Sequence, residues 1–409
     1  MNDLERISKR IESFRDEMIQ LQKDLTAIPA LDPSNGGEGE AKKADFLKSF
    51  LKKMKFSEIL EFNCPDPRVP SGYRPNIIAI YKGKSSKKKI WIMTHMDVVP
   101  PGELSLWKGD PYKAWVEDGK IFGRGVEDNQ QAMVASIFAI KAFEAEGILP
   151  NYDVGIVLVA DEETGSEKGI TYVLQNTDIF KKDDLIIVPD AGNPEGTMIE
   201  VAEKSILWLK FHIVGKQCHG SMPQKGINSH KAGANLIVRL DDFYKIFNAK
   251  DELFEPPIST FEPTKKEANV PNINTIPGDD IFYFDCRVLP NYKLSDVEAK
   301  FEEYAKKIEE EFKVKITLTP VQRAEAAPPT PPDADVVKKL YKAIKEVYGV
   351  EAKPMGIGGG TVAAIFRRAG FYAACWAKMD EMAHQPNEYC IIDNMVGDSK
   401  VFAHVCLQE

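Results

Sequence analysis

The sequence predicts an α/β fold in which a sheet is buried on both faces, with a smaller α+β domain inserted into the chain. Short aliphatic runs alternate with long helical patterns in the first half of the chain, which is typical of a mainly parallel sheet between helices. From Ser205 onward, polar and apolar residues alternate, which is typical of a sheet with one solvated face. A length of 409 residues suits roughly two to three domains of ordinary size.

The first elements follow from their hydrophobic periods. Apolar residues between positions 4 and 28 recur every three or four residues, so they predict one helix that ends at Pro29. A second amphipathic helix is expected over residues 44–54. Further elements are expected as strands at 76–81, 90–93, 154–160 and 185–188, a long helix at 130–146 and a polar turn at 82–89.

The inserted domain is expected to follow the order β, α, β, α, β. Its predicted elements are a strand from residue 205, a helix at 230–247, a strand at 281–288, a helix at 296–312 and a strand at 314–319. The proline-rich segment 326–332 is expected to be a connector. A helix at 334–348 and a strand at 372–376 are then expected to return to the first sheet.

The composition argues against several classes of partner and location. The formal charge of -9 argues against nucleic acid and against a membrane surface as the partner, because both attract basic proteins. No apolar run approaches about 18 residues, so neither a membrane span nor a secretory signal is expected. The six cysteines form no CxxC pair, which favours a reducing compartment, and we expect a cytoplasmic protein.

Acidic and histidine side chains follow three of the predicted buried strands. The strand at 90–93 leads into His95 and Asp97, the strand at 154–160 leads into Glu162 and Glu163, and the strand at 185–188 leads into Asp190. The carboxyl edge of an open α/β sheet is where ligands bind. We therefore expect these side chains to converge at one edge although they are distant in sequence.

Two further residues complete a set with metal-binding chemistry. Asp128 precedes the long helix at 130–146, where a carboxylate is favoured by the helix dipole. His384 lies on a loop after the strand at 372–376. Two histidines and several carboxylates suffice for a two-metal site with a bridging carboxylate. Mixed nitrogen and oxygen ligands suit zinc, cobalt or manganese better than calcium or magnesium.

A series of motifs across nearly the whole chain resembles the dinuclear-metal exopeptidases and deacylases. This family includes glutamate carboxypeptidase, aminoacylase, succinyl-diaminopimelate desuccinylase and the cytosolic dipeptidases. The motifs are HMD at 95–97, GRGVEDN at 123–129, DEE at 161–163, PD at 189–190, CHGSMP at 218–223, NTIPG at 274–278, DCR at 285–287, GGGT at 358–361 and AHQPNE at 383–388. Their order is the order found in the family.

The resemblance implies a zinc-exopeptidase-like catalytic domain formed by residues 1–204 and 320–409, interrupted by a lid and dimerisation domain at 205–319. It implies a homodimer through the inserted domain. It also implies two divalent ions, zinc before cobalt or manganese, with Asp128 as the bridging ligand. In this arrangement His95 and Asp190 complete one metal site, and Glu163 and His384 complete the other.

Further side chains receive roles around the ions. Glu162 is predicted as the general base, because a carboxylate beside an activated water can take its proton and later protonate the leaving nitrogen. Asp97 is predicted to orient His95. The resemblance gives His219 the stabilisation of the oxyanion, often in the active site of a partner subunit. It implies substrate binding by Arg287, Asn274, Gly359, Gly360 and Thr361.

The predicted activity is hydrolysis of the amide bond of a dipeptide, or of the terminal bond of a short peptide, by metal-activated water. Asp190 favours peptides, because many deacylases and carboxypeptidases of the family carry glutamate there. An N-acyl amino acid deacylase of desuccinylase or deacetylase type is the alternative. Val362 departs from the deacylases, which commonly carry aspartate at this position. Residues 129–131 differ from the residues usual after the bridging aspartate, so the pocket floor is expected to be unusual.

Two other classes remain as alternatives. A non-catalytic, peptide-binding descendant of the fold is the first, and the presence of Glu162 argues against it, because binding alone needs no general base. Two-metal phosphoester hydrolysis is the second, and the scarcity of basic residues around the predicted ligands argues against it.

Overall fold

A computed structural model describes residues 2–409 of the chain. Its contacts divide the chain into two compact units. The first unit runs to Val201 and also contains Pro329–Met355 and Thr361–Glu409, and the second unit consists of Ala202–Pro328 and Gly356–Gly360. Within residues 2–409, none of the helices has the length and apolar character that crossing a membrane requires.

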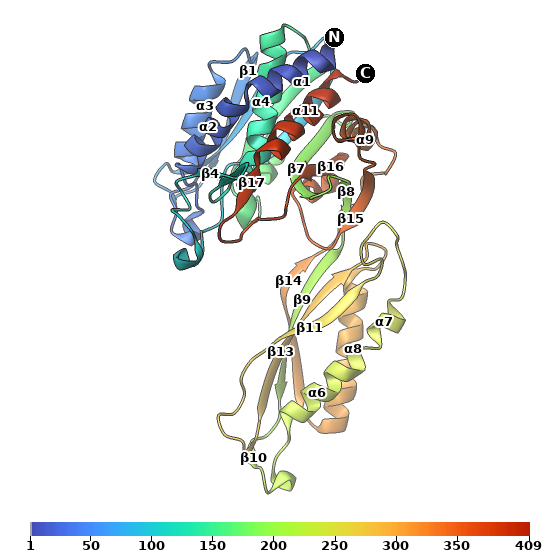
Figure 1. The fold of residues 1–409 in the computed structure, drawn as a ribbon. Helices are drawn as coiled ribbons and strands as arrows, with labels where there is room; N and C mark the ends of the chain where they lie inside the picture. Colours follow the sequence, from blue (N-terminus) through green and yellow to red (C-terminus); the bar gives the residue numbers. More distant parts are fainter. Residues whose placement is uncertain (1) are drawn as a thin grey trace. The chain divides into compact units, whose positions relative to one another are not determined.

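The first unit is built on an eight-stranded sheet with the strand order β1-β2-β6-β3-β7-β16-β8-β15 (Figure 1). The strands are β1 (Glu58–Pro65), β2 (Tyr73–Tyr81), β3 (Ser85–His95), β6 (Tyr152–Val159), β7 (Leu185–Asn193), β8 (Met198–Glu203), β15 (Lys353–Ile357) and β16 (Ala373–Lys378). The central strands β6, β3, β7 and β16 are parallel, and the pairs β1/β2, β2/β6 and β16/β8 are antiparallel. The predicted α/β class is confirmed.

Helices cover both faces of this sheet. They are α1 (Asp3–Ser13), α2 (Arg15–Thr26), α3 (Ala41–Leu51), α4 (Gln130–Glu146), α5 (Ile170–Asn176), α9 (Asp335–Tyr348), α10 (Ala363–Arg368) and α11 (Ile392–Leu407). On one face, α5 and α10 pack on Trp91, Met93 and their neighbours. Because strand residues alternate in direction, the equally buried Ile92 faces the opposite side. The helix α4 packs against β3 and β6 and also against α1, α2 and α11, which explains why it is apolar all round.

A small three-stranded sheet with the order β17-β5-β4 joins the loop before α4 to the loop before α11. Its strands are β4 (Trp115–Glu117), β5 (Lys120–Phe122) and β17 (Tyr389–Ile391). The pairing of Tyr389 with Phe122 brings segments that are far apart in sequence side by side. Both segments lead into loops that carry predicted metal ligands, Asp128 and His384.

Two of the predicted elements in the first unit were wrong in detail. The predicted helix over 4–28 is two helices, α1 and α2, interrupted at Phe14, whose backbone is not α-helical. The apolar period runs across the break because both helices bury the same side, with Ile11 and Met18 fully buried. The predicted turn at 82–89 becomes strand from Ser85 onward, because Ser85 and Lys89 pair with the start of β6 around a bulge.

The second unit has a four-stranded antiparallel sheet with the order β11-β13-β9-β14. Its elements are β9 (Ser205–Val214), α6 (Ser229–Leu240), α7 (Phe243–Ile246), β11 (Thr260–Lys266), β13 (Asp279–Val288), α8 (Leu294–Phe312) and β14 (Lys315–Ala324), with the ribbon β10 (Cys218–His219) and β12 (Thr275–Ile276). The helices α6 and α8 cover one sheet face around a core rich in phenylalanine.

One predicted helix and one predicted domain boundary in the second unit differ from the structure. The predicted helix at 230–247 is divided into α6 and α7. The predicted domain end at residue 319 falls inside β14, which continues to Ala324 because that residue still pairs with Ile206 of β9. The contacts accordingly place the end of this stretch of the second unit at Pro328.

The carboxyl group of Asp398, in α11, is fully buried, so its ionisation affects the stability of the fold. Gln131 and Tyr348 each donate a hydrogen bond to its carboxylate, at 2.8 and 2.9 Å, but burial raises the pKa of Asp398 to about 7. Because the folded pKa exceeds the unfolded one, the stability that this group contributes is lost as the pH rises from about 4 to about 7.

We expect Asp398→Asn to increase the free energy of unfolding at about pH 8 and to change it little at about pH 4, since the amide stays neutral at both. The difference between pKa values of about 4 and about 7 sets an upper limit of about 4 kcal/mol. Urea unfolding at the two pH values measures it. An equal destabilisation at both would contradict the assignment.

Candidate metal centre

The predicted polar residues lie at the carboxyl edge of the parallel strands in the first unit. His95 is the last residue of β3, Glu162 and Glu163 follow β6 in a short 3₁₀ turn, and Asp190 lies in the second half of β7. Because β6, β3 and β7 are parallel neighbours, their carboxyl ends meet at one edge. The topology therefore produces the predicted convergence.

The imidazole of His95 is buried at the centre of this group. Its Nε2 atom lies 2.9 Å from Oδ1 of Asp128 and 3.4 Å from Oδ1 of Asp190. Its Nδ1 atom lies 3.0 Å from the main-chain oxygen of Asp97 and 3.5 Å from the carboxylate of the same residue. With a proton on Nδ1 held by Asp97, Nε2 is the atom that faces the carboxylates. Nε2 donates to Asp128 while it is protonated, and its lone pair becomes available to a metal ion once that proton is lost.

The two oxygens of Asp128 face two different histidines. Oδ1 is 2.9 Å from Nε2 of His95, and Oδ2 is 3.3 Å from Nε2 of His384. The same nitrogen of His384 lies 3.0 Å from Oε2 of Glu163. This placement puts Asp128 between two sets of possible ligands, as a bridging carboxylate requires.

Two triads in this cluster have ligand atoms within 4.8 Å of one another. One contains His95, Glu162 and Asp190, and the other contains His95, Asp128 and Glu163. The predicted base Glu162 therefore lies in the same cluster as the predicted ligands.

The carboxylate of Asp97 does more than the sequence predicted. Its two oxygens accept hydrogen bonds from the main-chain N–H groups of Glu162 and Glu163, at 3.1 and 3.0 Å. The closer contact with the His95 ring is made by the main-chain oxygen of Asp97. Asp97 thus fixes the turn that carries Glu162 and Glu163, and its main chain fixes the histidine.

Asn129 differs from the residues usual at this position in the family motif, and the sequence predicted no role for it. Its Nδ2 atom donates to Oδ1 of Asp190 at 2.5 Å and to the main-chain oxygen of Pro189 at 3.0 Å. Asn129 is buried. The amide therefore holds the carboxylate of Asp190 in the orientation in which it faces His95.

Burial, neighbouring charges and hydrogen bonds shift the pKa values of several groups in this cluster. Burial, followed by the negative charge of Asp190, raises the pKa of Glu162 well above its usual range. Hydrogen bonds to Asp128 and Glu163 raise the pKa of His384 to about 10. Burial opposes ionisation of Asp128, but hydrogen bonds from His384 and His95 outweigh it and lower the Asp128 pKa.

These donors fit divalent cations. Five carboxylates and two imidazoles at one sheet edge carry excess negative charge, and buried like charges are costly unless cations or protons neutralise them. Hydrogen bonds to Asp128 and Glu163 raise the pKa of His384 to about 10, and a cation that binds its Nε2 displaces the proton there. The nitrogen and oxygen donors are of the type that zinc, cobalt and manganese accept.

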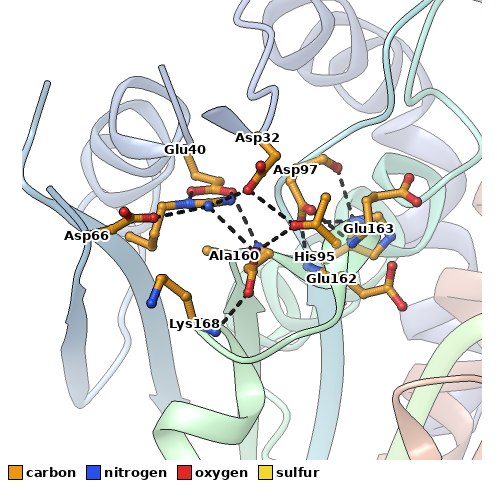
Figure 2. A network of polar contacts seen from close by, with 12 residues as sticks. Asp32, Glu40, Asp66, His95, Asp97, Ala160, Glu162, Glu163 and Lys168 are labelled. Atoms are coloured by element: carbon orange, nitrogen blue, oxygen red, sulfur yellow. Dashed lines mark hydrogen bonds and ion pairs between the residues drawn. The ribbon is translucent and has the colours of Figure 1, made fainter. Parts of the chain in front are cut away.

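A second charged cluster supports the turn from its other side. Figure 2 shows Glu40 and Asp66 on one side of the strand end at Ala160 and His95, Glu162 and Glu163 on the other. The buried guanidinium of Arg74 donates to Glu40 at 2.6 Å and to Asp32 at 2.6 Å. It also lies 3.6 Å from Asp66 and 3.5 Å from Asp161.

Asp161 connects this cluster to the metal centre. It precedes Glu162 with a left-handed backbone, φ 63°, and its N–H donates to Glu40 at 3.3 Å. Its carboxylate accepts bonds from Thr164 at 2.7 Å and from the N–H of Lys168 at 2.8 Å. The contacts of Arg74 were not predicted, because its partners come from three separate segments of the chain.

Two of the predicted residues of the second unit lie together on its β10/β12 ribbon. His219 pairs with Thr275, and the main-chain oxygen of Asn274 accepts a hydrogen bond from Gly220 N at 2.6 Å. Both side chains are exposed. The Nδ1 atom of His219 lies 2.8 Å from the hydroxyl of Ser221 and accepts a hydrogen bond from Ser221 N at 3.2 Å.

The predicted substrate-binding residue Arg287 is already engaged within the second unit. Its Nε and Nη2 atoms donate to Asp285 at 2.6 and 2.9 Å, and Nη1 donates to the main-chain oxygen of Gly358 at 2.7 Å. A substrate carboxylate would therefore find a guanidinium that Asp285 already neutralises. Among residues 2–409, Gly359 and Gly360 have open space on the side where a side chain would lie, so a ligand can approach the backbone there. The remaining predicted residue, Thr361, belongs to the first unit and accepts a contact from Cys375 at 3.5 Å.

The fold and this donor set define a metal-dependent hydrolase. Residues 91–408 match peptidase family M20/M25/M40, so the chain belongs to this family, and the predicted resemblance is confirmed.

Relatives of the chain have several different names. An uncharacterized metallohydrolase of Methanococcus maripaludis is 42% identical over 417 residues, which cover 97% of this chain and 100% of the relative. Succinyl-diaminopimelate desuccinylase of Nitratiruptor sp. is 24% identical over 91% of this chain and 94% of its own. The structure of human carnosine dipeptidase 1 has the same fold, with a TM-score of 0.75 at 19% identity, over 100% of this chain and 98% of that chain.

Replacement of Arg74 tests the charged cluster behind the turn. Arg74→Met leaves Asp32 and Glu40 buried without their cation, which typically costs about 3–5 kcal/mol. We expect a large fall in the free energy of unfolding, measured with urea. Lys42→Met is the control, because Lys42 pairs with Glu38 where both side chains are exposed, and it should change stability by about 0.5 kcal/mol or less. Equal effects of the two changes would contradict the role of Arg74.

Proposed function

We propose that this metallohydrolase is a two-metal exopeptidase that cleaves the amide bond of a dipeptide or the terminal bond of a short peptide. The observation that carries the proposal is the position of Asp128, whose two oxygens face His95 and His384 at 2.9 and 3.3 Å. In this proposal His95 and Asp190 hold one ion, and Glu163 and His384 hold the other.

The ions, when bound, supply the Lewis acidity that polarises the scissile carbonyl and lowers the pKa of water. Zinc suits the donors best, and cobalt or manganese are alternatives. Glu162 takes the proton of the attacking water and delivers it to the leaving nitrogen. Its raised pKa, caused first by burial, suits a group that must both accept and donate a proton.

His219 and Asn274 are proposed to bind the substrate, with His219 donating a hydrogen bond to the oxyanion of the tetrahedral intermediate. Their support is joint exposure on the β10/β12 ribbon. We further propose, as the resemblance implies, that the chain acts as a homodimer through the second unit and works in the cytoplasm. Sedimentation velocity of the purified chain tests the dimer.

A second candidate function is removal of an acyl group from an N-acyl amino acid. The desuccinylase of Nitratiruptor sp., 24% identical over 91% of this chain, favours it. The presence of aspartate at position 190 favours the peptidase, because many deacylases of the family carry glutamate there.

A substrate panel separates the two candidates. Dipeptides should be turned over faster than N-acetyl and N-succinyl amino acids, with zinc, cobalt and manganese each supplied to the metal-free protein. Released amine is measured with ninhydrin. Turnover confined to acylated amino acids would reject the exopeptidase and favour the deacylase.

Glu162→Gln tests the base. The amide cannot accept the proton of water, so we expect kcat to fall by about 10²–10⁴-fold while the metal content stays near that of the parent. His384→Ala should instead deplete the metal content. Metal analysis by mass spectrometry and steady-state kinetics measure both. A Glu162→Gln variant with parental kcat would show that another group is the base.

A further inference from the structure

The bridging residue Asp128 and the histidine His384 come from two loops that are far apart in sequence. One loop precedes α4 and includes residues 123–128, and the other connects β16 to β17 and includes residues 379–388. The pairing of Phe122 with Tyr389 anchors one end of each loop, but the two ligands lie beyond this ladder. Their relative position therefore also depends on contacts between the loops.

Glu388 of the second loop binds the backbone of the first. Its Oε1 atom accepts hydrogen bonds from the N–H groups of Glu127 and Asp128, at 2.9 and 3.1 Å. Its Oε2 atom accepts from Gly125 N at 2.9 Å and from Nη1 of Arg124 at 2.7 Å. The Glu388 side chain is fully buried, so water does not compete for these bonds.

Glu127 of the first loop binds the backbone of the second. Its carboxylate accepts hydrogen bonds from Asp380 N at 2.8 Å and from Met382 N. It is 2% exposed and neighbours Asp128 in the chain. Each loop thus supplies one buried carboxylate that accepts hydrogen bonds from main-chain N–H groups of the other loop.

These hydrogen bonds fix the position of one loop relative to the other. A buried carboxyl group whose two oxygens accept two or more hydrogen bonds holds the donors in defined directions. The main-chain N–H of Asp128 is one of the groups held, and His384 lies between the N–H groups held by Glu127 and the carboxylate of Glu388. The two ligands are therefore fixed relative to each other through the main chain.

We propose that Glu127 and Glu388 are positioning residues that keep Asp128 and His384 at the separation that a metal ion between them needs. The proposal rests on the proposed two-metal function. Neither residue belongs to the two groups of candidate metal ligands. Glu388 belongs to the AHQPNE motif, whereas Glu127 lies inside GRGVEDN, and no role was predicted for either.

Glu127→Gln is the principal test, because the amide nitrogen cannot accept the second N–H. The metal-free protein is titrated with Zn²⁺ or Co²⁺ in a calorimeter, and the metal content is measured after gel filtration. We expect one ion to bind as in the parent and the other to bind about 10–100-fold more weakly. The kcat should fall while KM changes little, and excess metal should restore most of the kcat, which a general loss of folding would not allow.

Two further variants keep the test decisive. Glu381→Gln is the matched control, because Glu381 is an exposed acid in the same loop and should leave both ions and kcat unchanged. Glu127→Asp keeps the charge but shortens its reach, and an intermediate loss of the weaker ion is expected. It replaces Glu127→Gln if circular dichroism shows that the amide variant does not fold.

The outcomes separate this proposal from the proposed function. A parent that binds no divalent ion overturns the two-metal function and the positioning role together. A parent with two ions and a folded Glu127→Gln variant with two equally tight ions overturns only the positioning role. Equal weakening of both ions contradicts it as well, because Glu127 then does not act on the His384 side.

Discussion

The convergence of negative charge at one edge of the central sheet is the constraint on which the rest of the first unit depends. Asp97, Asp128, Glu162, Glu163 and Asp190 would repel one another strongly in a site from which much of the water is excluded. The structure offsets this repulsion with two histidines, main-chain N–H groups and the buried amide of Asn129. What remains is a site that favours cations.

The supports behind the site are themselves charged and buried. Arg74 binds Asp32 and Glu40, and the fully buried Lys43 of α3 has a pKa that burial lowers to about 8 against the opposing effect of Asp97 and Glu40. Such pairs seldom add net stability compared with apolar residues, but removing one partner is costly. We infer that their value lies in holding the turn at Asp161 in a single conformation.

The second unit follows a different physical rule. Its sheet buries one face against α6 and α8 and leaves the other solvated, so the strands alternate and are easily read from the sequence. The same openness leaves His219 and Asn274 exposed on the ribbon. Arg287, by contrast, is tied to Asp285 on the same face of β13 and to Gly358. The contact with Gly358 joins residues 71 apart in sequence, so the local sequence could not indicate it.

The sequence by itself determined the α/β class, the long buried helix at 130–146 and the identity of the residues that gather around His95. These depend on hydrophobic period and on residues that follow strands, which are local properties of the chain. The family motifs added the pairing of distant residues. The break at Phe14 and the end of β14 were not predictable, because local pattern continues across both positions.

Only the tertiary structure decided which groups hold the ligands in place. The partners of Arg74 come from three segments, and Asn129 reaches Asp190 at the sheet edge. Glu127 and Glu388 each accept main-chain hydrogen bonds from a loop about 260 residues away. None of these contacts leaves a periodic or compositional trace. A buried carboxylate can be read from the sequence as a candidate ligand, but its hydrogen-bond donors are chosen by how the chain folds back on itself.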